Sequence, residues 1–185
     1  MIGRKKRNCR SLVWALVLLN LSAASALAQE TPNAARKVEL SYLFLGSVKT
    51  GGSWKVGRCS DVVVTATEPV AVVAALCGTH QFLNGQEVDD SLGSFLGGIR
   101  FRKRFGRRIA SFVEGLAGAE TGFRYGGFRS NSGFSFDVGG GVDLALKNWL
   151  ALRILHAKYQ TTWIDGGNMN GLRIHTGLVL RFGKR

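Results

Sequence analysis

The segment at residues 172–182 alternates between two kinds of side chain, and this pattern restricts the fold more than any other feature of the sequence. Its even-numbered residues are apolar or carry a methyl group, and they end with Phe182. Its odd-numbered residues include Arg173, His175 and Arg181. Because successive side chains of a β-strand point to opposite faces, the segment predicts a strand with one apolar and one polar face. A membrane β-barrel requires such strands, with the apolar face outside and the polar face inside.

The N-terminus has the three parts of a secretory signal. A basic head precedes the mostly apolar segment 11–21, and a stretch of small residues ends at Ala28. This order predicts a signal peptide over residues 1–28, with cleavage before Gln29. The apolar segment is shorter than the roughly 20 residues of a spanning helix, so a membrane anchor is disfavoured. The polar residues 29–36 are expected to form a flexible lead-in.

Composition narrows the class of protein further. The chain has 25 Lys and Arg residues against 12 Asp and Glu residues, which favours an anionic partner such as a phosphorylated glycolipid. The basic residues are scattered between expected strands rather than gathered on a helix, which argues against nucleic acid. Only 2 prolines occur, as suits paired strands, because each proline removes a ladder hydrogen bond. Two classes remain, namely a secreted β domain and an outer-membrane barrel.

Period-two alternation and glycine-containing turns divide the rest of the chain into eight expected strands of about ten residues, the length that a tilted membrane strand needs. We expect them at residues 37–48, 54–65, 70–80, 92–103, 109–120, 134–145, 149–161 and 172–182. The connections after the first, second, fourth and sixth strands are short, whereas 81–91, 121–133 and 162–171 are expected to be exposed loops. Apart from the short first connection, this asymmetry is typical of bacterial outer-membrane barrels.

Tryptophans lie where expected strands meet turns. They are Trp54, Trp149 and Trp163. Interfacial aromatic belts of membrane proteins occupy this level, whereas an ordinary core would place such residues in mid-strand. The tryptophans therefore favour a membrane barrel.

Several strand motifs resemble those of small eight-stranded outer-membrane barrels of the OmpA/OmpX type. The motifs are Gly97–Phe101, Phe112–Gly118, Gly139–Asp143, Trp149–Arg153 and Gly177–Gly183. The resemblance covers roughly residues 37–183 and implies one domain, an all-β, eight-stranded antiparallel up-and-down transmembrane β-barrel of the bacterial outer membrane. It also implies a monomer without cofactors, embedded in outer-membrane lipid. The barrel-assembly machinery is expected to read Phe182 as the C-terminal signal.

The inner faces of the expected strands carry charges of both signs. An eight-stranded barrel is just wide enough inside for side chains to fill it, and buried charges must be paired. We therefore predict an ion-pair network that fills the lumen. Its predicted members are Glu39, Arg100, Arg102, Glu114, Asp137, Asp143 and Arg153. The alternative is a small porin-like channel lined by the same residues, which would need a wider barrel.

Cys59 and Cys77 lie at equal distances from Glu68, in the turn between the second and third expected strands. A hairpin centred there sets the two cysteines opposite each other at a Cα separation of roughly 4.5–5.5 Å, within disulfide range. We predict a cross-strand disulfide, with two buried free thiols as the alternative. No CxxC or paired-histidine spacing accompanies the cysteines, so no metal site is expected.

His156 and His175 lie on adjacent expected strands and could in principle form an acid–base pair. The apolar sets of both strands fall on even numbers, so we predict that His156 faces lipid and His175 faces the lumen. The two side chains would then point apart, and acid–base catalysis depends first on geometry. We therefore predict no enzymatic activity.

The expected role is structural or interactive, through the longer loops. The residues of the middle loop that we expect to contact a partner are Arg124, Tyr125, Phe128 and Arg129. Exposed aromatic and arginine side chains suit recognition. The alternative is a soluble lipocalin-like carrier of an apolar ligand, because Gly52-Ser53-Trp54 resembles a lipocalin motif. The absence of a helical pattern after residue 36 disfavours that alternative.

Overall fold

The computed structural model describes residues 37–49, 54–83, 86–124, 130–164 and 167–183. The expected signal peptide (1–28) and lead-in (29–36) lie outside the described residues. The strands are β1 (Val38–Lys49), β2 (Trp54–Thr67), β3 (Val70–Leu83), β4 (Gln86–Phe105), β5 (Ile109–Arg124), β6 (Ser130–Ala145), β7 (Leu150–Ile164) and β8 (Gly167–Phe182).

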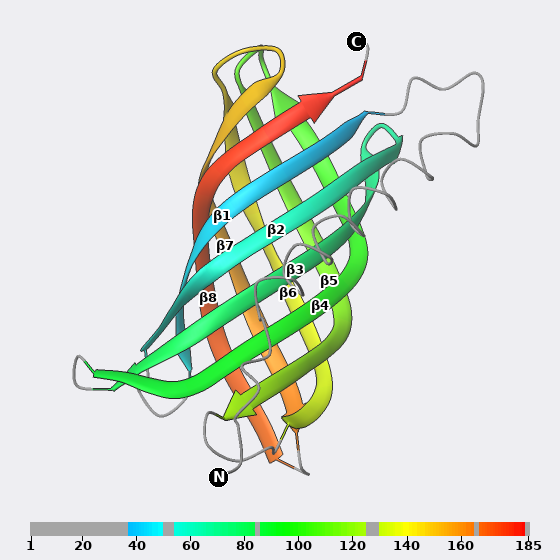
Figure 1. Ribbon diagram of the computed structural model, residues 1–185. Coiled ribbons are helices and arrows are strands. Elements are labelled where there is room, and N and C mark those ends of the chain that lie inside the picture. The colour runs from blue at the N-terminus through cyan, green and yellow to red at the C-terminus, as the bar shows by residue number, and fades with distance from the viewer. Residues whose placement is uncertain (1–36, 50–53, 84–85, 125–129, 165–166, 184–185) are drawn as a thin grey trace, which may run out of the picture. The chain divides into compact units, whose positions relative to one another are not determined.

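The eight strands close into one antiparallel barrel (Figure 1). Each strand pairs with the next along the chain, and the ladder closes between β1 and β8, where Val38 lies opposite Phe182. Closure leaves no unpaired sheet edge. The predicted all-β, eight-stranded antiparallel architecture is confirmed.

The barrel has two different ends. At one end, called the turn end, short connections join β2 to β3, β4 to β5 and β6 to β7, and β1 begins beside the end of β8 (Figure 1). At the other end, called the loop end, β1 connects to β2, β3 to β4, β5 to β6 and β7 to β8. This division follows from the up-and-down order of the strands.

The strands run further toward the loop end than the sequence predicts. Backbone pairing between β3 and β4 continues to Leu83 opposite Gln86, so the loop expected at 81–91 is largely strand. The predictions of loops at 121–133 and 162–171 are also wrong in extent, because the flanking strands extend into both segments. Ladder hydrogen bonds need no apolar face, so pairing continues where the hydrophobic alternation fades.

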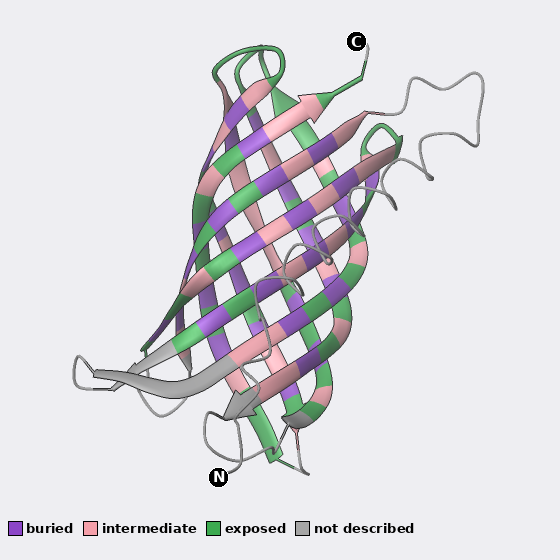
Figure 2. Ribbon diagram, in the orientation of Figure 1, coloured by how far each residue is buried: buried purple, intermediate pink, exposed green. Residues whose placement is uncertain are grey.

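Burial alternates along the described parts of the strands (Figure 2), and most of the large exposed side chains are apolar. On β1, Leu43 is 0% exposed, whereas its neighbours Tyr42 and Phe44 are 46% and 60% exposed. Trp54, at the start of β2, is 64% exposed. The outer face is therefore an apolar surface, while most of the buried charged side chains point inward.

A β-bulge interrupts this alternation in β7. The register against β8 shifts between Arg153 and His156, and both Ile154 and Leu155 are exposed. One extra residue therefore lies on the outside, and beyond it even-numbered instead of odd-numbered residues face inward. Tyr159, an odd-numbered residue that regular alternation would put inside, is consequently on the outer face and 50% exposed.

Among the described residues, no helix is long and apolar enough to cross a membrane.

Candidate functional site

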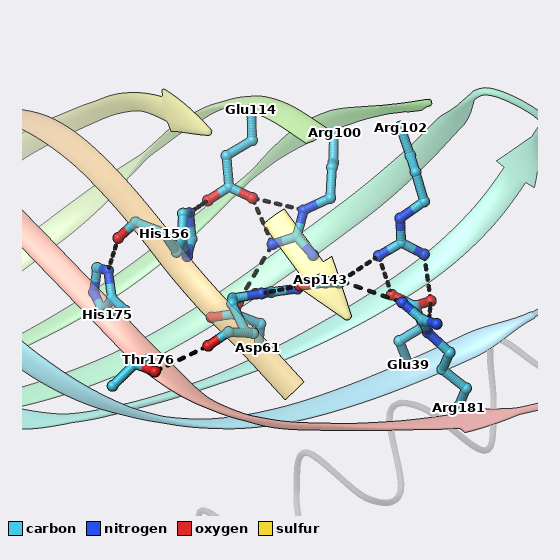
Figure 3. A network of polar contacts seen from close by, with 11 residues as sticks. Glu39, Asp61, Arg100, Arg102, Glu114, Asp143, His156, His175, Thr176 and Arg181 are labelled. Atoms are coloured by element: carbon cyan, nitrogen blue, oxygen red, sulfur yellow. Dashed lines mark hydrogen bonds and ion pairs between the residues drawn. The ribbon is translucent and has the colours of Figure 1, made fainter. Parts of the chain in front are cut away.

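The lumen contains a continuous network of polar side chains, which begins near the turn end (Figure 3). Arg102 binds both carboxylate oxygens of Glu39, and Arg181 Nε donates to Glu39 Oε1 at 3.0 Å. The same two arginines approach Asp143 Oδ2 at 3.2 and 3.3 Å. These four residues come from β4, β1, β8 and β6, so the group joins strands on different sides of the barrel.

Two arginines continue the network through the middle of the lumen (Figure 3). Asp61 Oδ2 accepts from Arg100 Nη2 at 3.3 Å and from Arg153 Nη1 at 3.0 Å. Arg153 Nε also donates to Asp143 at 2.8 Å, and Arg100 Nε donates to Glu114 at 2.7 Å. Each guanidinium thus connects two carboxylates, which satisfies charges that would be costly to bury alone.

The buried ring of Phe112 lies against both central guanidinium groups. The Cζ atoms of Arg100 and Arg153 lie 4.3 and 4.5 Å from its centroid. Gly141 provides the space, because a Cβ at that position would come within 2.7 Å of Phe112 Cζ. The aromatic ring therefore attracts both cations through its π-face.

The loop-end half of the network centres on Glu120. Its carboxylate accepts from Gln160 at 2.7 Å and from Thr162 at 2.6 Å, and it pairs with Arg173 at 3.4 Å. Arg173 also donates to Ser94 Oγ at 3.4 Å. Because Arg173 is on β8 and Ser94 is on β4, this contact crosses the full width of the lumen.

The ion pairs between these inward-facing residues join six carboxylates and six cations. Its carboxylates are Glu39, Asp61, Glu114, Glu120, Asp137 and Asp143, and its cations are Arg100, Arg102, Arg153, Lys158, Arg173 and Arg181. Such pairing allows charged groups to remain buried at low cost. The arrangement fills space and fixes the strands relative to one another.

All seven residues that the sequence assigned to the lumen lie on the inner face within this network. Strand alternation also put Arg173 and Arg181 on the polar face of the last strand, but it could not identify their partners. Lys158 was missed because the β7 bulge reverses the alternation. Glu120 was missed because the alternation of its strand is weak in sequence.

The prediction that His156 faces lipid is wrong. The bulge turns His156 inward, where it is 0% exposed and pairs in register with His175. The two ring centroids are 5.0 Å apart, and His175 Nδ1 lies 3.3 Å from the His156 carbonyl oxygen. His156 Nε2 lies 2.9 Å from Glu114 Oε1. The lumen therefore contains two adjacent histidine side chains, which regular strand alternation had placed on opposite faces.

The predicted disulfide is confirmed. Cys59 and Cys77 lie directly opposite each other on β2 and β3, with a Cα–Cα distance of 4.1 Å, and their sulfurs are bonded. Both side chains point into the lumen beside Leu43 and Leu45. The symmetric position of the turn was sufficient to establish this pairing.

Of the four residues predicted to contact a partner, only Arg124 lies within the described part of the chain. Arg124 is the last residue of β5. Tyr125, Phe128 and Arg129 lie outside the described residues. Phe182 ends β8 with its side chain on the outer face.

The turn end has a basic rim around a cavity of about 670 Å³. Lys37, Arg104 and Arg107 contribute to its lining. Glu68, in the β2–β3 turn, accepts a hydrogen bond from Lys37 Nζ at 3.1 Å and lies 3.9 Å from Arg104. The hydrogen bond from Lys37, together with the positive charges of Lys37 and Arg104, holds the pKa of Glu68 below its ordinary value.

A closed strand ladder, an apolar exterior and a charged, side-chain-filled interior together define a transmembrane β-barrel of the outer-membrane type.

Comparison with solved structures finds barrels of the same fold. Neisserial surface protein A (NspA) matches with a TM-score of 0.60 at 11% identity, covering 80% of this chain and 98% of that one. Ail, the attachment invasion locus protein of Yersinia pestis, matches with a TM-score of 0.51 at 16% identity, covering 80% and 99%. The N-terminal barrel domain of Pseudomonas aeruginosa OprF matches with a TM-score of 0.50 at 11% identity, covering 79% and 97%.

No protein-family model matches the chain, and a search of curated proteins also gives no match. The structural likeness therefore establishes the fold. The likeness in fold confirms the resemblance to small eight-stranded outer-membrane barrels.

Proposed function

We propose that the chain is an integral protein of the bacterial outer membrane whose filled barrel is a rigid scaffold, without catalysis, for interactions at the loop end. The observation that carries this proposal is the set of ion pairs between strands that are not neighbours. Arg102 on β4 pairs with Glu39 on β1, and Arg153 on β7 pairs with Asp61 on β2. Such pairs cross the lumen, so the barrel interior serves stability rather than passage.

The two alternative functions fit the burial pattern less well. A lipocalin-like carrier needs an apolar interior for its ligand and a polar exterior for water. Here Arg100 and Arg153 are 0% exposed inside, while Phe95 and Ile99 are 57% and 49% exposed outside. A porin-like channel needs an open lumen, whereas an eight-stranded barrel is filled by its own side chains.

Planar-bilayer recording tests the filled lumen. The folded wild-type barrel is expected to give no unitary current steps. A double substitution that removes one central pair without changing net charge, Asp143→Ala with Arg153→Ala, is expected to produce small steps because it empties part of the lumen. Resistance to SDS before heating serves as the folding control for both proteins. Steps from the wild-type barrel would contradict the scaffold proposal and support the channel.

Arg58 supports an anionic glycolipid as a membrane partner. It lies on the outer face of β2, is exposed, and is close to Trp54 at the loop end. A cation on a lipid-facing surface costs roughly 2–4 kcal/mol at the midplane and about 0–1 kcal/mol near the interface. A glycolipid phosphate at that level would offset the cost by direct pairing.

Co-purified glycolipid phosphate provides the measurement for this partner. The substitution Arg58→Gln is expected to lower the amount bound per barrel, whereas Arg107→Gln, at the turn end, is expected to leave it unchanged. Equal amounts on all three proteins would remove Arg58 from the proposed contact.

A further inference from the structure

The disulfide and a lumen histidine form a group of three potential metal ligands. The donor atoms of Cys59, Cys77 and His175 all lie within 4.8 Å of one another, and all three side chains are buried. Two thiolate sulfurs and one imidazole nitrogen form a donor set typical of tetrahedral zinc. Sequence spacing could not reveal this group, because barrel closure brings His175 on β8 to the hairpin of β2 and β3.

The contacts of the His175 ring leave one of its nitrogens available to a metal ion. Its Nδ1 lies 3.3 Å from the His156 carbonyl oxygen, a contact that places the proton on Nδ1 and leaves the lone pair on Nε2. That Nε2 atom is buried and has no hydrogen-bond partner among the described residues. A hydrogen bond from the other ring nitrogen to a carbonyl is the usual support of a metal-binding histidine.

The surroundings favour a bound cation over free thiolates. Cys59 and Cys77 cluster with Leu43 and Leu45 and are 1% and 3% exposed. An apolar environment disfavours uncompensated thiolates, whereas a divalent cation neutralises two of them. The disulfide alone accounts for the two cysteines, but it does not account for the unpartnered Nε2 of His175.

We propose that the dithiol form of this barrel binds one zinc ion through Cys59, Cys77 and His175, and that disulfide formation abolishes the site. A dithiol reductant supplies two electrons and two protons to the Cys59–Cys77 bond and itself becomes a disulfide. The two resulting thiols each release a proton when their sulfurs bind Zn²⁺. Reoxidation to the disulfide removes both sulfur ligands and releases the ion, so zinc binding depends on the redox state.

Cobalt substitution provides the test, because Co²⁺ with thiolate ligands gives visible and near-ultraviolet bands that report tetrahedral coordination. The protein purified from membranes would be unfolded with a reductant and refolded into detergent with Co²⁺ alone as the probe. Wild type refolded in the reduced state is expected to bind one Co²⁺ with these bands, and zinc should displace it. Oxidised wild type is expected to show neither property.

Two histidine variants define the site. His175→Gln keeps a side chain of similar size and is expected to weaken Co²⁺ binding by more than the roughly 10–100-fold cost of losing an outer-shell partner. His80→Gln, on the outer face, is expected to bind as wild type does. A folded, reduced wild-type barrel without the bands would overturn the proposal, as would wild-type affinity in folded His175→Gln. Comparison of oxidised with reduced wild type decides the matter even if His175→Gln fails to fold.

Discussion

Two carboxylates near each other in sequence show how burial sets the energetic cost of removing a charged group. Asp61 is buried in the lumen between Arg100 and Arg153, where removal of the carboxylate would leave two cations partly uncompensated. Glu68 is in the β2–β3 turn, with 66% of its side chain exposed, and pairs with Lys37 in contact with water. Burial, rather than the number of partners, therefore determines what each substitution costs.

Substitution of the buried carboxylate should be the more damaging. Asp61→Asn is expected to lower the free energy of unfolding by about 3–5 kcal/mol, the cost of breaking a buried pair on one side. Glu68→Gln is expected to cost about 0.2–1 kcal/mol, as for exposed pairs. Urea titration of the barrel in lipid vesicles would measure both values. Equal losses would show that the lumen is well hydrated.

The titration of Glu68 should follow its hydrogen bond from Lys37. Its pKa is lowered in the folded barrel, so its contribution to stability is present above the unfolded-state pKa and is lost as pH falls through the folded-state pKa. Lys37→Gln is expected to raise the Glu68 pKa toward its ordinary value. Carboxyl chemical shifts followed by NMR would detect the change, and an unchanged pKa would mean that solvent screens the pair.

At the scale of elements, the bulge in β7 decides which residues face the lumen. Without the extra outward residue, His156 and Lys158 would follow the even-numbered residues onto the lipid face. Thr176 Oγ1 donates to the Arg153 carbonyl oxygen at 3.0 Å beside the bulge, so the irregularity is supported from β8. A single inserted residue thus determines half of the inner face of this strand.

Deletion within the bulge should be better tolerated than deletion beside it. Removal of Leu155 restores a regular ladder and keeps His156 and Lys158 inside, so the barrel is expected to remain SDS-resistant before heating. Removal of Ala157 reverses the facing of Lys158 and Gln160 and is expected to abolish the resistant form. Gel mobility with and without boiling compares the two, and similar behaviour would show that β7 can slip in register.

For the whole molecule, the strands of β3–β4, β5–β6 and β7–β8 extend into long hairpins at the loop end, while the turns lie at the opposite end of the barrel. In outer-membrane barrels the short turns face the periplasm and the longer connections face outward. The Cys59–Cys77 disulfide leaves no reactive thiol in the barrel, so a single introduced cysteine reports its own position.

Labelling of intact cells should therefore distinguish the two ends. Asn168→Cys, exposed at the loop end, is expected to react with a membrane-impermeant maleimide, whereas Arg107→Cys, in the β4–β5 turn, should react only after the outer membrane is broken. Labelling of Arg107→Cys alone on intact cells would reverse the proposed orientation.

The sequence by itself determined the eight strands, the antiparallel order and the cysteine pairing. Strand alternation and turn residues are local signals, and the disulfide depends only on a hairpin whose centre can be located in the chain. Strand alternation also predicted correctly that Cys77 on β3 and His175 on β8 face the lumen.

Only the tertiary structure decided which charges pair, which way His156 faces and how the cysteines meet a histidine. Arg153 and Asp61 are 92 positions apart, and no periodic pattern links residues across a closed lumen. Regular strand alternation cannot predict the bulge in β7, which brings His156 beside His175. Contacts across a barrel depend on closure and register, because these place residues that are distant in sequence on facing walls.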